Sequence, residues 1–282
     1  MTTAANTANS PASSTAAKPP SLDRHEVWAR AIAALLFVAA AAFTLLGIHS
    51  MSGAMRMPGG WRMSMVWMPM PGQSPLGAGA MFLWMWVAMM IAMMLPSTWP
   101  MLELYRKVAV SSGQKSPALA SAVVGLGYFA VWAAFGALVF GAGWWGSSAA
   151  MRSSLFSRAV PLLAGTGLIF AGAYQVSPWK QACLSHCRSP LMFLGHVFRP
   201  GIGGALRVGV AHGLFCAGCC WALMLMQSIL GVMNLPVMIL IAVLIGAEKL
   251  WVQGPVLARI TGCASIAAGF YFLVRTVLPP AA

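Results

Sequence analysis

Four potential metal ligands lie close together in a segment that is otherwise apolar and long enough for a helix. In the run HGLFCAGCCWALM they are His212, Cys216, Cys219 and Cys220. At about 100° per helical residue, His212, Cys216 and Cys220 follow one another at intervals of one turn. Cys219 lies one turn from Cys216 on the other side. We therefore expect all four side chains on one helix face, where thiol and imidazole groups could bind a transition metal.

One helix cannot surround a metal ion alone, so further ligands must come from another segment. The preceding polar connection contains CLSHC, in which Cys183 and Cys187 are spaced for one helix face. Ser177 and Pro178, just before it, are typical of an N-cap and a first helical position. We predict a short amphipathic helix here, which could fold back so that its cysteines meet His212 and Cys216. The predicted metal ligands are Cys183, Cys187, His212, Cys216, Cys219 and Cys220, with His186 as a possible secondary ligand.

Two other interpretations of these cysteines remain open. A cysteine is often a small buried apolar residue, and we interpret Cys263 in this way. Small residues also promote helix packing in membranes, so the AGCC stretch could be a packing surface. We expect no structural disulfides, because the predicted positions are cytoplasmic or within the membrane. A bare thiolate is costly in lipid, and a bound cation that displaces the proton removes that cost.

Methionines suggest which metal is bound. The chain has 21 of them, and thioether sulfur suits Cu(I) but scarcely serves Zn(II). We therefore predict Cu(I) as the preferred ion and Zn(II) as the second choice. The alternative is that methionine fills apolar space. One group lies in a predicted outer loop: Met51, Met55, Met57, Met63, Met65, Met68 and Met70.

A second group of methionines occupies the apolar run MFLWMWVAMMIAMMLP. Met81, Met85 and Met89 follow one helix face, and Met90 and Met94 follow another. An outer methionine-rich loop, methionine-lined spans and a buried Cys/His row could together form a relay for Cu(I). The possible secondary ligands in this run are Met85, Met89 and Met93.

Glu103 and Glu248 are the acidic residues nearest to the apolar runs. An ionisable residue at such a position suggests function, here a cytoplasmic metal gate or a proton acceptor. The alternative is a surface ion pair, because basic residues are adjacent. For Glu103 these are Arg106 or Lys107, and for Glu248 the neighbour is Lys249.

The elements that must hold these residues are predicted to be membrane-spanning helices. The chain is 60% hydrophobic and only 7% charged, whereas soluble domains carry about 25% charged residues. Its apolar residues form long runs near the roughly 20 residues that cross a bilayer, and such spans must be helical. We predict an all-α polytopic fold with about seven spans. These are Ala29–Ile48, Gly79–Pro100, Ala118–Ala142, Ala159–Val176, Ala205–Leu230, Leu235–Leu250 and Val256–Val277.

The distribution of basic residues predicts the orientation. With a cytoplasmic N-terminus, 12 of the 17 Lys and Arg residues fall on the inner side and 5 on the outer side. This explains the net charge of +13 without nucleic acid, since no basic helix face is formed. The expected organisation is a disordered cytoplasmic tail (1–28), a first span (29–48), a methionine-rich outer loop (49–78), a helical membrane domain with the Cys/His motifs (79–277) and a short outer tail (278–282).

Several motifs resemble a bacterial family of predicted metal-binding integral membrane proteins, a domain of unknown function. They are WVAMMIAMMLP, YQVSPWKQACLSHCRSP, HGLFCAGCCWALM, and GVMNLP followed by AEKL. The resemblance covers roughly residues 80–255 and implies a multi-pass metal-binding protein of the bacterial inner membrane, with no stated activity. The matching positions are the six predicted Cys and His ligands and Glu248.

The sequence favours binding of a soft transition metal, preferably Cu(I), for transport, delivery or homeostasis. Possible partners besides the lipid bilayer are a metallochaperone or a membrane enzyme complex. One alternative is a membrane thiol oxidoreductase with Cys216 and Cys219 as its redox pair. Another is a metal-binding assembly factor or subunit of a membrane metalloenzyme.

Overall fold

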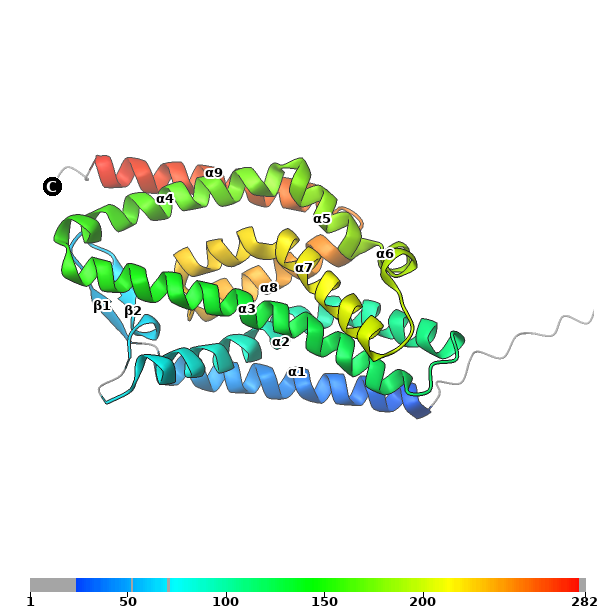
Figure 1. Cartoon of the computed structure of the whole chain (residues 1–282). Coiled ribbons are helices and arrows are strands. Elements are labelled where there is room, and N and C mark those ends of the chain that lie inside the picture. The colour runs from blue at the N-terminus through cyan, green and yellow to red at the C-terminus, as the bar shows by residue number, and fades with distance from the viewer. Residues whose placement is uncertain (1–23, 52, 70–71, 279–282) are drawn as a thin grey trace, which may run out of the picture.

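The computed structural model describes residues 24–51, 53–69 and 72–278, and this part of the chain is almost entirely helical (Figure 1). The predicted all-α class is therefore confirmed. The predicted N-terminal tail and the last residues of the predicted outer tail lie mostly outside the described residues. The helices are α1 (Arg24–Met51), α2 (Pro75–Ser111), α3 (Pro117–Arg152), α4 (Ser154–Val176), α5 (Pro178–Arg188), α6 (Pro190–Val197), α7 (Ile202–Gly231), α8 (Leu235–Leu250) and α9 (Gly254–Val277).

Six of the described helices are long and apolar enough to cross a membrane, namely α1, α2, α3, α4, α7 and α9. The predicted sixth span coincides with α8, which has 16 residues and falls short of the roughly 20 that a bilayer requires. Six candidate spans thus stand where we predicted about seven, and the cytoplasmic N-terminus remains a prediction. The second span was predicted too short, because α2 continues through Pro96 and Pro100 to Ser111.

The helices form a bundle with short helices at one end and a pair of short strands at the other (Figure 1). α1 packs on α2, α3 on α7, and α4 on α9, while α8 lies inside the bundle against α2, α5, α7 and α9. The short helices α5 and α6 connect α4 to α7 and lie at the end of the bundle where α4 ends and α7 begins. The strands β1 (Ala54–Arg56) and β2 (Arg62–Ser64) pair antiparallel at the opposite end, and the 3-10 helix η1 (Met65–Trp67) follows them.

Glycine allows the closest helix contacts in this bundle. A Cβ atom at Gly209 of α7 would collide with the backbone of Val124 in α3. A Cβ at Gly127 of α3 would lie 3.0 Å from the carbonyl oxygen of Leu206 in α7. Small residues let helix backbones approach in membranes, where van der Waals contact drives association. The α3–α7 pair is therefore a tight unit, and α7 is the helix that carries the cysteine row.

Candidate metal centre

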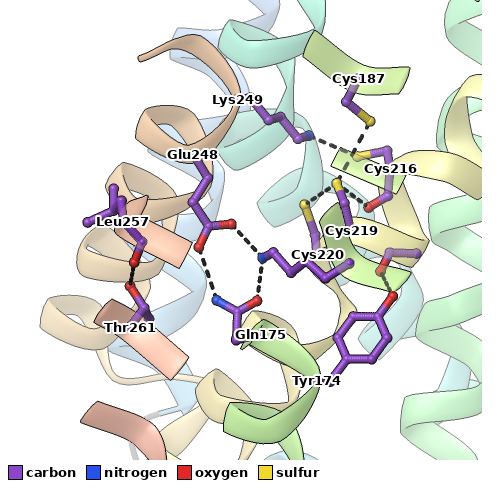
Figure 2. Close-up of polar contacts among 12 residues, drawn as sticks. Tyr174, Gln175, Cys187, Cys216, Cys219, Cys220, Glu248, Lys249, Leu257 and Thr261 are labelled. Carbon is purple, nitrogen blue, oxygen red and sulfur yellow. Dashed lines mark hydrogen bonds and ion pairs between the residues drawn. The ribbon is translucent and has the colours of Figure 1, made fainter. Parts of the chain in front are cut away.

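Three thiols of α7 converge in the core of the bundle. The Sγ atoms of Cys216, Cys219 and Cys220 all lie within 4.8 Å of one another, and the three residues are buried. The sulfurs of Cys219 and Cys220 are 3.3 Å apart (Figure 2). The one-turn spacing in the sequence produces this convergence, because it keeps Cys216, Cys219 and Cys220 on one side of α7. We call Cys216, Cys219 and Cys220 the thiol cluster.

A fourth sulfur reaches the thiol cluster from α5. Ser177 caps this helix by accepting a hydrogen bond from the amide of Lys180, and Pro178 is its first residue. The predicted short helix is thus confirmed, and it folds back onto α7 as expected. The sulfur of Cys187 lies 3.8 Å from that of Cys219 (Figure 2). Because Cys187 is only half-buried, it is the member of the group nearest to the outside of the bundle.

Cys183 lies beside the thiol cluster rather than inside it. Its sulfur would be 3.0 Å from a Cβ atom placed on Gly218, so Cys183 packs against the backbone of α7. The hydroxyl of Tyr174 donates to the carbonyl oxygen of the same Gly218 at 2.6 Å. The cysteines of α5 thus approach α7 near residues 218 and 219, whereas we expected them to meet His212 and Cys216.

Two groups that the sequence analysis did not single out surround the sulfur of Cys216. The ammonium of Lys249 donates to it at 2.9 Å, and the hydroxyl of Tyr128 lies at the same distance (Figure 2 for Lys249). Lys249 also donates to the hydroxyl of Ser97 at 3.4 Å. A buried ammonium is costly unless an anion or strong acceptor pairs with it. This geometry therefore suits Cys216 as a thiolate.

Glu248 pairs with a lysine distant in the sequence instead of with its neighbour Lys249. Its carboxylate accepts from Lys180 of α5 at 2.5 Å and from the amide of Gln175 in α4 at 3.0 Å. Lys180 also donates to the Gln175 carbonyl oxygen. All three side chains are buried. Figure 2 shows this network beside the thiol cluster, with Glu248 and Lys249 pointing to different partners.

A second contact between α5 and α8 lies next to Cys187. The guanidinium of Arg188 donates to the carbonyl oxygens of Glu248, Trp251 and Val252 at 2.7, 2.6 and 3.1 Å. These carbonyls lie at or just after the C-terminal end of α8, where helical partners are lacking. Lys180 and Arg188 thus hold both ends of α5 against the C-terminal end of α8, and this fixes the helix that carries Cys187.

The two predicted histidine ligands occupy different environments. His212 is buried, stacks on Tyr128 with a centroid distance of 5.4 Å, and contacts the ring of Phe193 at 5.5 Å. Its Nδ1 atom has no hydrogen-bond partner. His212 precedes Cys216 by one helical turn, and its ring lies outside the group of ligand atoms within 4.8 Å. His186 is exposed, stacks on Phe215 and bonds to the carbonyl of Ala182.

The methionines of α2 line the inside of the bundle. Met85, Met89 and Met93 are buried, with exposed fractions of 4%, 3% and 5%. The Met89 sulfur accepts from the side-chain amide of Gln227 at 3.4 Å. The sulfur of Met94 lies 3.9 Å from the ammonium of Lys249. Two faces of α2 therefore carry sulfur, and Met94 brings it into the neighbourhood of the thiol cluster.

The outer methionine-rich loop and Glu103 have separate structural partners. Met57 and Met63 are buried together with Ala150 of α3 in a small apolar cluster, whereas Met55 and Met65 are exposed. Packing thus accounts for part of this loop. Met70 and the side chain of Met51 lie outside the described residues. Glu103 forms an ion pair with Arg30 of α1 at 2.5 Å, while the expected partners were Arg106 or Lys107.

Comparison with known proteins gives one match. Residues 83–272, about two thirds of the chain, match the family model described as PpoB2, copper chaperone. The matched range includes α5, α7, α8 and most of α2, and so contains the thiol cluster, Cys187 and Lys249. No curated protein and no solved structure matches the chain significantly.

Proposed function

The chain belongs to the PpoB2 copper chaperone family, and we propose that it binds Cu(I) at the thiol cluster and Cys187. The observation that carries this proposal is the convergence of three buried sulfurs within 4.8 Å, with a fourth 3.8 Å from Cys219. Apolar helices surround these sulfurs. Metal binding by a membrane protein is the simplest reason for gathering thiols in such an interior.

The spacing of the sulfurs suits a thiolate-bound ion. Metal–thiolate bonds are about 2.3 Å long in zinc sites, and three such bonds around a trigonal ion place the sulfurs about 4 Å apart. The sulfurs of Cys219 and Cys220 are 3.3 Å apart, and no separation within the thiol cluster exceeds 4.8 Å. Small changes of side-chain rotamer would therefore be enough to close the thiols around an ion. Cys187 could replace one member of the cluster as a ligand, because it already touches Cys219.

Charge and donor type favour Cu(I) over Zn(II). With two of the three cluster thiols deprotonated, the thiolates and Cu(I) carry a net charge of −1, and the ammonium of Lys249 beside Cys216 cancels it. A neutral assembly is the form that an apolar interior tolerates best. Sulfur ligands also select Cu(I), whereas carboxylate and imidazole suit harder or borderline ions. The nearest carboxylate, Glu248, is already bound by Lys180 and Gln175.

Delivery of copper to a partner is the role that this arrangement supports best. Cys187 is half-buried on α5 and contacts the buried thiol cluster, so it offers a route for exchange between the interior and an incoming ligand. We propose that the ion moves between the thiol cluster and a metallochaperone or membrane enzyme through Cys187. By the distribution of basic residues, this exchange occurs at the cytoplasmic face of a bacterial inner membrane.

The test is metal analysis of the purified full-length protein in detergent, with Cu(I) supplied under reducing conditions. We expect wild type to retain copper against a competing Cu(I) chelator and to show copper–sulfur scattering in X-ray absorption. The variant Cys216→Ser/Cys219→Ser/Cys220→Ser should lose the tightly held copper. Cys263→Ser is the matched control, because Cys263 is exposed on α9.

Equal copper retention by the triple variant and wild type would overturn the proposal. The thiol oxidoreductase alternative makes a different prediction. In that case, labelling of Cys216 and Cys219 in metal-free protein would require prior reduction. Free thiols that become protected only when Cu(I) is added support metal binding instead.

A further inference from the structure

A small cavity lies between α1, α2 and the turn that joins α7 to α8, and four methionines line it. They are Met85 and Met89 of α2, Met233 of the turn and Met238 of α8. The remaining lining residues are Thr44, Phe82, Trp86 and Val232. Met85, Met89 and Met238 are buried. Thioethers from two helices and a turn thus meet around one space inside the bundle.

A buried amide with an unused oxygen contacts Met89, one of the residues that line this cavity. Gln227 of α7 is 2% exposed and donates its Nε2 hydrogen to the sulfur of Met89 at 3.4 Å. Its Oε1 atom has no hydrogen-bond partner. A buried carbonyl without a partner costs about 1–3 kcal/mol, so an apolar core alone does not explain this glutamine. If the amide group turned over, its oxygen would face Met89 and could bind a cation there.

The cavity is in line with the thiol cluster. Gln227 follows Cys220 by seven residues on α7, which places it about two turns, or roughly 10 Å, further along the same helix face. Met89 and Met94 connect the two regions along α2, and the Met94 sulfur lies 3.9 Å from Lys249. Met89, Met94 and the thiol cluster belong to one contiguous buried core.

We propose that the thioethers of Met85, Met89 and Met238, together with the Gln227 carbonyl oxygen, form a second site for a soft monovalent cation, Cu(I). The inference extends the proposed function, because the second site lies in line with the thiol cluster. Its ligands are all neutral and leave the charge of the ion uncompensated. The second site therefore binds Cu(I) more weakly than thiolates do, as suits a position from which the ion passes on to Cys216, Cys219 and Cys220.

The alternative is that these methionines only fill apolar space. It is tested by replacing the sulfur atoms while keeping the side-chain volume. The variant Met85→Leu/Met89→Leu/Met238→Leu preserves the apolar core, because Leu and Met differ little in size. Variants of the full-length protein are titrated with Cu(I) against a chelator in detergent. Circular dichroism and size-exclusion chromatography confirm that each one folds. Met151→Leu/Met192→Leu, which alters exposed residues of α3 and α6, is the matched control.

Binding at the second site is measured alone in the variant Cys187→Ser/Cys216→Ser/Cys219→Ser/Cys220→Ser, which removes the thiol site. We expect this variant to keep one weakly held Cu(I), and we expect adding the three Met→Leu changes to abolish it. Selenomethionine-labelled protein in the same background should show copper–selenium scattering that the Met→Leu changes remove. The control Met151→Leu/Met192→Leu should leave both signals intact.

Failure of this inference and failure of the proposed function give different results. If the background with four Cys→Ser changes binds no copper, or if its bound copper and selenium scattering survive the Met→Leu changes, the second site is overturned. If the background with four Cys→Ser changes holds copper as tightly as wild type, the proposed thiol site fails. The selenium scattering then still decides whether Met85, Met89 and Met238 bind the ion.

Discussion

The ammonium of Lys249 lies 2.9 Å from the sulfur of Cys216, and both side chains are buried in the helix bundle. Lys249 comes from the end of α8 and Cys216 from the middle of α7. Placing a fixed positive charge beside a thiol in an apolar interior favours its deprotonated form, because each charge relieves the cost of burying the other. The thiol cluster is thus prepared to receive a cation.

Lys249→Met should weaken Cu(I) binding by about 10–100-fold, the usual effect of removing a group that supports a metal ligand. The methionine side chain keeps the apolar volume but removes the charge that balances the copper–thiolate complex. Chelator competition measures the change, and Lys107→Met, at an exposed position of α2, is the control. Unchanged affinity in Lys249→Met would show that the ammonium plays no part in binding.

Breaking the buried ion pair between Glu248 and Lys180 should destabilise the protein strongly. Either Glu248→Gln or Lys180→Met leaves one uncompensated buried charge, which typically costs about 3–5 kcal/mol. The double variant should cost less than either single variant. Reversible unfolding in mixed micelles measures these free energies.

The ion pair between Arg30 and Glu103 provides the comparison, because its side chains are 46% and 20% exposed. For such a pair we expect Arg30→Gln to change stability by no more than about 1 kcal/mol. Equal effects for the buried and the exposed pair would contradict the role that we assign to burial.

Cys187→Ser should slow the exchange of bound copper more than Cys183→Ser does. The sulfur of Cys187 touches the thiol cluster, whereas that of Cys183 packs against Gly218. Transfer of copper from the loaded protein to a colorimetric chelator, followed in time, measures the exchange. Equal rates in the two variants would mean that the path does not pass through Cys187.

Gly209→Ala should destabilise the bundle by about 1–3 kcal/mol, the usual cost of overfilling a packed interface. The added methyl group would collide with the backbone of Val124 and push α3 away from α7. Gly246→Ala is the control, because a Cβ atom at Gly246 meets nothing within 4 Å. There the gain in helix propensity, roughly 1 kcal/mol, should stabilise the protein. Thermal unfolding of the two variants should therefore shift in opposite directions.

The parts of the structure that the sequence predicted depend on local periodicity. One-turn spacing was enough to place Cys216, Cys219 and Cys220 together, and Ser177 with Pro178 located the start of α5. The contact of Cys187 with Cys219 follows from the return of α5 onto α7, which we expected, although the contact is shifted along α7. Apolar run length likewise located the long helices.

The parts that were missed depend on contacts distant in the sequence. Tyr128 is 88 residues from Cys216, and Lys180 is 68 residues from Glu248. No local pattern could pair them. Lys249 was counted among the cytoplasmic charges, since the sequence does not tell whether a lysine at a helix end points out to water or into the bundle. The adjacency of Glu248 and Lys249 suggested a surface ion pair, whereas each of them is buried with a partner from another helix.

This adjacency fixes the rotation of α8 about its own axis. Neighbouring helical residues point about 100° apart, so Glu248 can reach Lys180 while Lys249 reaches Cys216 in only one azimuth of the helix. Turning α8 by one residue step would present the Glu248 carboxylate to the sulfurs, and turning it the other way would present the Lys249 ammonium to Lys180. Either contact would be repulsive. The two opposite charges therefore select one orientation of α8 in the bundle. An insertion between Leu235 and Glu248 would rotate both charges away from their partners.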